Sequence, residues 1–185
     1  MSTPDFETIK NNWETFERLC KKLEDEGVNN LLEALGERLV TAPAATHDSS
    51  PGCFPGGLIQ NSLETTSKLK KAANLFDNLN TTSLLKVGLL HEIGKVGDLS
   101  NNLFVDQESD WHREKLGQNY KYNEVIPKAT VHDRTLMILQ HFGVKLTHDE
   151  FMAIRLSQGS HLEENKFYVG SEPDLAVALQ IAKRV

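Results

Sequence analysis

The chain has 185 residues, of which 39% are hydrophobic and 25% charged, with a formal net charge of −6. This length suits one globular domain, and the acidic balance argues against nucleic acid as a partner, because proteins that bind its backbone usually carry a basic face. No run approaches the roughly 18 apolar residues of a membrane span. The opening MSTPDFETIK has no export signal, so we expect a cytoplasmic protein with no membrane partner.

Two helices and two unpaired thiols are predicted from the first half of the chain. Apolar residues recur at steps of three and four over 6–23, which predicts an opening helix with one apolar stripe. A second helix follows over 31–39, with Asn29 or Asn30 as its cap. Cys20 and Cys53 form no CxxC pair and fit reduced thiols better than a disulfide.

The next two predicted helices are antiparallel neighbours. Helical spacing returns over 58–76, and Thr82 is the expected cap of a helix that carries the apolar run 84–90. Residues 96–131 lack a sustained period. Their short runs 103–105 and 119–122 predict a small β-hairpin.

Three helices are predicted to close the chain. The first covers HDRTLMILQHF, and the second covers THDEFMAIRLSQG with Thr147 and Glu150 in reciprocal capping positions. The last begins near Pro173, a residue suited to a first turn. The predicted fold class is therefore all-α with a minor hairpin between the central helices.

Four segments follow one another in a distinctive order: CFPGGLIQNSLETT, LLHEIGK, VHDRTLMILQHFG and LAVALQIAKRV. Together they resemble the HD-domain metal-dependent phosphohydrolases over about residues 50–185. The resemblance implies a helical bundle that holds one or two divalent metals and acts on phosphoesters of nucleotides. It also implies an HD-like domain over 46–185, with 1–45 as N-terminal helices packed on it in a single globular unit.

Most places that the resemblance assigns to metal ligands hold other residue types here. Asn61 and the pair Ser157-Gln158 occupy positions where the family has histidines. Glu92 follows His91 where the family has Asp, and Lys183 occupies the position of the family's last Asp ligand. An ammonium has no lone pair to give, and a carboxamide is a poor substitute for imidazole. His91 and His132 match intact, with Glu92 a partial case, so a metal site would comprise these three residues.

Other residues of the family's cavity match better than the metal ligands do. The resemblance assigns ligand contacts to Asn61, Lys95, Trp111, Tyr120, Tyr122, Asn123, Arg134 and Lys183. Lys and Arg suit phosphate, and the aromatic rings could stack on a base. The leading hypothesis is therefore a catalytically degenerate HD-domain protein that binds a nucleotide or another phosphorylated small molecule, for sequestration or sensing, without a cofactor.

Two alternatives remain open. An active phosphohydrolase would use a rearranged centre of His91, Glu92 and His132 with a divalent metal (Mn, Mg, Fe or Zn), and Asp133 could join it. A scaffold or interaction protein would use the apolar stripe with Trp13 and Phe16 to form a homo-oligomer, although burial in the core explains that stripe equally well.

Overall fold

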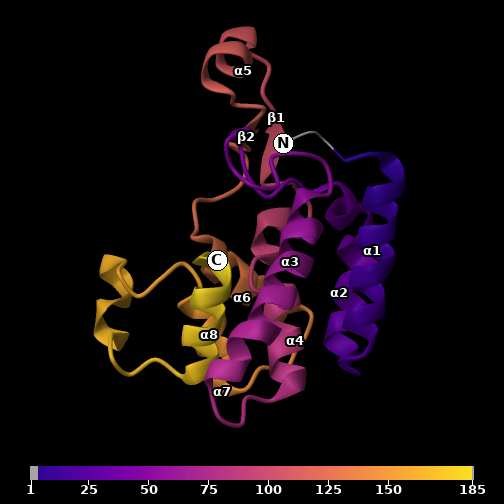
Figure 1. Ribbon diagram of the computed structural model, residues 1–185. Helices are drawn as coiled ribbons and strands as arrows, with labels where there is room; N and C mark the ends of the chain where they lie inside the picture. The colour runs from indigo at the N-terminus through magenta and orange to yellow at the C-terminus, as the bar shows by residue number, and fades with distance from the viewer. Residues whose placement is uncertain (1–3, 185) are drawn as a thin grey trace.

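The computed structural model describes residues 4–184 and is mainly helical (Figure 1). Its described helices are α1 (Phe6–Lys21), α2 (Glu26–Thr41), α3 (Gly57–Ala72), α4 (Thr81–Leu90), α5 (Asp110–Leu116), α6 (Val131–His141), α7 (His148–Arg155) and α8 (Asp174–Arg184). Short 3-10 turns are η1 (Ala73–Leu75), η2 (Ile93–Val96) and η3 (Glu163–Tyr168). None of the helices within 4–184 is long and apolar enough to cross a membrane.

The residues that cap α2 and α4 differ from those predicted. Asp25 caps α2 by accepting from the backbone N–H groups of Gly27 and Val28, so the prediction of Asn29 or Asn30 was wrong. Likewise Asn80, not Thr82, caps α4. In both cases a short Asx side chain lies just before the first turn, where unpaired N–H groups need an acceptor.

The predicted capping box of α7 is confirmed, because Thr147 and Glu150 satisfy each other's backbone N–H groups. Both cysteines are free and buried, as expected.

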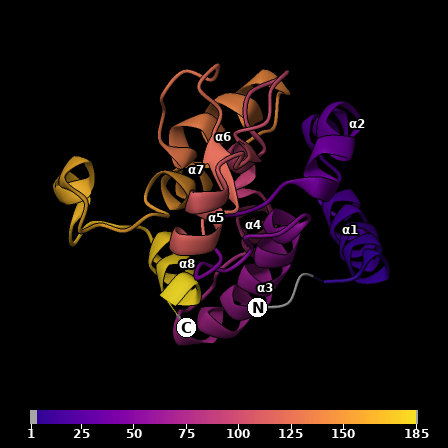
Figure 2. The same ribbon diagram turned by 90° about the horizontal axis from the view of Figure 1, so that it is seen from above.

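The core joins the two N-terminal helices to the rest of the bundle. Buried side chains of α1 and α2 belong to the same apolar cluster as those of α3, α4 and α8, with Phe16, Val28, Leu58, Leu89 and Leu179 fully buried. In Figure 1, α1 and α2 lie together on one side of α3, while α7 and α8 lie on the other. From above, η3 projects away from this body (Figure 2).

The predicted hairpin is confirmed, and it carries a helix that the sequence did not reveal. Strand β1 (Phe104–Asp106) pairs antiparallel with β2 (Tyr120–Tyr122), so that Phe104 lies opposite Tyr122. Helix α5 lies between the strands and is capped by Ser109. With seven residues and none of them buried, it has no apolar face from which a period could be read.

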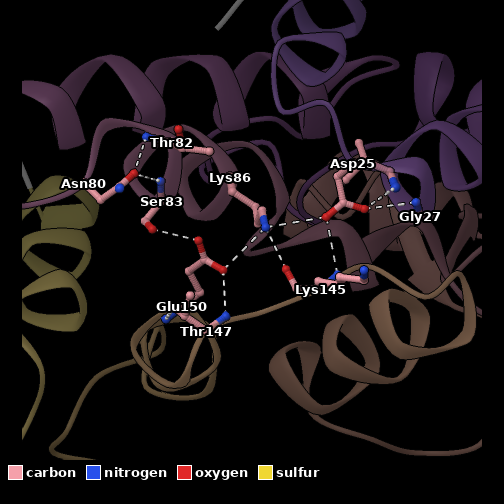
Figure 3. Close-up of polar contacts among 10 residues, drawn as sticks. Asp25, Gly27, Asn80, Thr82, Ser83, Lys86, Lys145, Thr147 and Glu150 are labelled. Atoms are coloured by element: carbon pink, nitrogen blue, oxygen red, sulfur yellow. Dashed lines mark hydrogen bonds and ion pairs between the residues drawn. The ribbon is translucent and has the colours of Figure 1, made fainter.

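A buried group of charged side chains connects α2, α4 and α7 (Figure 3). We call this group the Lys86 cluster: Lys86 of α4 lies 3.5 Å from both Asp25 Oδ2 and Glu150 Oε2, and its Nζ donates to the carbonyl oxygen of Lys145 at 2.6 Å. The Ser83 hydroxyl donates to the other Glu150 oxygen at 2.7 Å. The cluster fixes the start of α2 and the start of α7 to α4.

Candidate functional site

The backbone around His91 and Glu92 is held by a close crossing of η2 and α6. Helix α4 ends at Leu90, so His91 lies at its C-cap and Glu92 just before η2. A side chain on Gly94 would lie 2.6 Å from the carbonyl oxygen of Val131, which is why only glycine allows this approach. The Thr135 hydroxyl accepts from the Gly94 N–H at 3.0 Å and donates to the carbonyl oxygen of His91 at 3.3 Å.

Glu92 is a buried carboxylate between two lysines. Lys95 Nζ lies 2.7 Å from Oε2, and Lys183 Nζ, from α8, lies 2.8 Å from Oε1. Gln158 adds a longer contact of 3.4 Å from Nε2 to Oε1. We call these four residues the Glu92 centre. Two cations on one carboxylate leave a net positive charge, and the lysine side chains keep 17% and 20% of their surface exposed.

The electrostatics keep Glu92 ionised. Burial by itself would raise the pKa of its carboxyl group, but Lys95 and Lys183 outweigh burial and hold the pKa well below its usual range. The carboxylate is therefore an ion-pair partner and not a proton donor at neutral pH.

His91 lies beside this carboxylate as a neutral imidazole. Its Nδ1 lies 3.1 Å from the carbonyl oxygen of Gly88 and must carry the proton, since a carbonyl can only accept. The other nitrogen, Nε2, then keeps its lone pair. The pKa of His91 is lowered to about 4, mainly by burial; Glu92 opposes this shift and Lys183 adds to it.

His132 is also neutral, but its lone pair is already used. Arg155 Nη1 donates to His132 Nε2 at 2.6 Å and to Asn165 Oδ1 at 3.0 Å. Burial lowers the pKa of His132, with Arg155 and Lys183 acting in the same direction. The proton is thereby on Nδ1, a buried atom that finds no acceptor among residues 4–184.

These contacts do not fit a divalent metal ion. Two ammonium groups contact the two oxygens of Glu92, and a guanidinium contacts the lone pair of His132. Of the three predicted metal ligands, His91 alone therefore keeps a free donor atom, Nε2, that could bind a metal. Over the part of the chain that the structure describes, no three His, Cys, Asp or Glu side chains are grouped so as to hold a metal. The predicted set His91, Glu92 and His132 would need these contacts to break first.

A cavity of about 420 Å³ borders the Glu92 centre at Lys95. Its walls include Phe104 and Tyr120 from the β-hairpin and Pro43 from the chain after α2. Tyr120 is one of the aromatic residues that the sequence assigned to ligand contact. The cavity thus combines aromatic and apolar walls with one lysine of the Glu92 centre.

The remaining predicted contacts lie elsewhere. Asn61 donates from its side chain to the carbonyl oxygen of Pro51 at 3.2 Å, and so ties α3 to the preceding loop. Trp111 lies on α5 with 59% of its surface exposed. Tyr122, Asn123 and Arg134 line a different cavity, on the side of α6 where the chain enters that helix.

Two residues near the site were missed by the sequence reasoning. Arg155 contacts His132, and Asn165, which is fully buried, receives that guanidinium and donates to the carbonyl oxygen of Gly159 at 2.8 Å. An arginine in a last helical turn is ordinarily a cation favoured by the helix dipole. Only the three-dimensional contact distinguishes Arg155 from that common case.

Comparison of this chain with protein-family models, with curated proteins and with solved structures gave no match.

Proposed function

We propose that the chain is an HD-like helical bundle that binds a nucleotide or another phosphorylated small molecule at the Glu92 centre without hydrolysing it. The observation that carries this proposal is the pairing of one buried carboxylate with two partly exposed lysines. The centre keeps an unbalanced positive charge at the place where the resembled family would keep a divalent cation.

The surrounding charges favour an anion over a cation. His91 and His132 are neutral, because the pKa of each is lowered, so they do not add to or cancel the lysines. Around His132, Arg155 is opposed by Asp133 and Glu164, so the excess positive charge is that of Lys95 and Lys183 on Glu92. Lys183 acts on the pKa of both histidines, which indicates that they share one electrostatic neighbourhood. A phosphate accepting from Lys95 and Lys183 would form charge-assisted hydrogen bonds, which are stronger than neutral ones.

The cavity beside Lys95 supplies room for the rest of such a ligand. A volume of about 420 Å³ lies within the range of small-molecule sites. Phe104 and Tyr120 offer aromatic faces to a base or another flat group. A phosphate at Lys95 would then fix the orientation of a body lying against the hairpin.

The test is a calorimetric titration of the purified protein with nucleoside monophosphates, nucleoside triphosphates and inorganic phosphate. Lys95→Met and Lys183→Met should each weaken binding by at least about tenfold, since each removes one charge-assisted contact. Lys70→Met is the matched control, because Lys70 is an exposed lysine on α3, and it should bind like the unchanged protein.

Two outcomes would overturn the proposal. Equal affinity of the Lys95→Met, Lys183→Met and Lys70→Met variants would show that the Glu92 centre takes no part in binding. Release of phosphate that requires added Mn²⁺ and disappears in His91→Ala would support the active phosphohydrolase instead. Native mass spectrometry of the protein taken directly from cells would report any co-purified ligand or metal.

A further inference from the structure

Arg134 is a buried cation with few partners in the protein. The residue is only 7% exposed, yet its one hydrogen bond within the described chain runs from Nη2 to the carbonyl oxygen of Pro127 at 3.0 Å. Its Nε atom is buried and finds no acceptor among residues 4–184. No carboxylate of those residues forms an ion pair with it, although an arginine stays charged at any relevant pH.

A buried guanidinium without a counter-ion is unfavourable, because burial removes water without replacing its hydrogen bonds. Two other shielded cations of this chain have more partners than Arg134 has. Lys86 has two carboxylates and a carbonyl oxygen, and Arg38 donates to Asn102 Oδ1 and to three carbonyl oxygens of the 96–101 turn. Arg134 therefore differs from these two cations.

Arg134 lines two cavities, of about 410 Å³ and about 570 Å³, and the larger of the two has largely apolar walls. Tyr122, Ile126 and Val131 are among its lining residues, together with Leu103 and Pro127. Glu124 and Lys128 also line this cavity, and their opposite charges offset each other. The net charge of the lining is therefore the single positive charge of Arg134. That balance suits a monoanion better than a phosphate dianion.

We infer that this cavity is a second ligand site, which binds a small organic carboxylate with an aromatic or branched aliphatic body. The carboxylate accepts from the guanidinium of Arg134, whose planar donors match a carboxylate in geometry. The body lies against Tyr122, Ile126 and Val131, where it removes apolar surface from water. This site is separate from the Glu92 centre and does not depend on the function proposed for it.

The test compares benzoate with benzamide, which has nearly the same shape without the charge. Binding is followed by NMR, with the Arg134 Nε–H signal as a local reporter and backbone signals of Tyr122 and Val131 as a second one. Benzoate should shift these signals in a saturable manner and bind at least about tenfold more tightly than benzamide. This pair of probes needs no variant, so the result does not depend on how a substitution affects folding.

Variants then assign the contact. Arg134→Met should weaken benzoate binding by at least about tenfold, whereas Arg134→Lys should retain part of it as a point charge. Arg18→Met, which changes an exposed arginine of α1, is the control and should leave binding unchanged. Lys95→Met should also leave it unchanged.

Equal affinity for benzoate and benzamide would overturn the inference, as would benzoate binding that Arg134→Met does not weaken. Loss of benzoate binding in Lys95→Met alone would likewise overturn it and assign the carboxylate to the Glu92 centre. Absence of any shift up to about 10 mM benzoate would show that the cavity does not select carboxylates at a useful affinity.

Discussion

The Lys86 cluster and the Glu92 centre have opposite arrangements of the same chemical groups. The first places one ammonium between two carboxylates, and the second places one carboxylate between two ammonium groups. Side chains of the Lys86 cluster keep only 3% to 11% of their surface exposed, while the two lysines of the Glu92 centre keep 17% and 20%. A backbone carbonyl and a hydroxyl complete the Lys86 cluster, whereas a cavity adjoins the Glu92 centre.

The difference is between an ion cluster that the protein's own groups complete and one whose excess positive charge adjoins a cavity. In the Lys86 cluster three helices meet, and both oxygens of Glu150 are already used by protein donors. In the Glu92 centre the excess charge is positive and partly open to solvent. An added anion would complete the second group, but it would only compete with carboxylates already present in the first.

Removal of the central lysine should give the largest effect on stability. Lys86→Met leaves Asp25 and Glu150 buried close to one another without a counter-charge, so we expect the free energy of unfolding to fall by about 3–5 kcal/mol. Urea unfolding followed by circular dichroism measures this. In the Lys86→Met/Glu150→Gln double variant, which removes one of the two carboxylates, part of that loss should return. A loss below about 1 kcal/mol for the single variant would contradict a structural role.

Removal of the central carboxylate of the Glu92 centre should lower stability by less, and phosphate should restore part of that stability. Glu92→Gln leaves two lysines facing each other, but their partial exposure reduces the penalty, so we expect a loss of about 2 kcal/mol. A ligand that binds the folded state at roughly a hundred times its Kd restores nearly 3 kcal/mol. Inorganic phosphate should therefore raise the melting temperature of Glu92→Gln by more than it raises that of Lys86→Met. An equal response in both variants would remove the distinction between the two groups.

The sequence predicted the parts of the fold that show in a long apolar period, in a reciprocal capping pair or in two short strand-like runs. The α7 capping box and the hairpin follow from such patterns, and the structure confirms both. Helix α5 could not be predicted in this way, because its seven residues include none that are buried. The caps of α2 and α4 were misplaced by a few residues, since several Asn, Asp and Thr side chains compete near each helix start.

The candidate site was predictable only in part, for a different reason. Lys95 lies one turn from Glu92, so their contact is a local one, but Lys183 reaches the same carboxylate from 91 positions further along the chain. The resemblance placed both lysines near one cavity before any contact could be known. It could not separate Tyr120 from Tyr122, which alternate along one short strand yet line different cavities.

The pH dependence of stability should reflect the neutral histidine of the Glu92 centre. The pKa of His91 is about 4 in the folded chain and near its ordinary value of about 6.5 when unfolded. Between these values the unfolded chain binds a proton that the folded chain does not, so stability falls as the pH falls. We expect a loss of about 2 kcal/mol from about pH 7 to about pH 5.

Unfolding in urea at the two pH values measures this loss. His91→Asn should reduce the dependence, and the remainder should come in part from His132, whose pKa is also lowered. His148→Asn, at an exposed histidine, should leave it as it was. An unchanged slope in His91→Asn would assign the effect to other groups.

The smallest expected effects on stability come from removing one supporting hydrogen bond from the Lys86 cluster and one from the Glu92 centre. Ser83 donates to Glu150 at 2.7 Å, whereas Gln158 donates to Glu92 at 3.4 Å, beyond the usual range for such a bond. Ser83→Ala should therefore cost about 1.5 kcal/mol in the free energy of unfolding, and Gln158→Met about 0.5 kcal/mol or less. Both are measured by urea unfolding under the same conditions. If Gln158→Met cost as much as Ser83→Ala, Glu92 would depend on protein donors as fully as Glu150 does, and it would have less freedom to share its lysines with an anion.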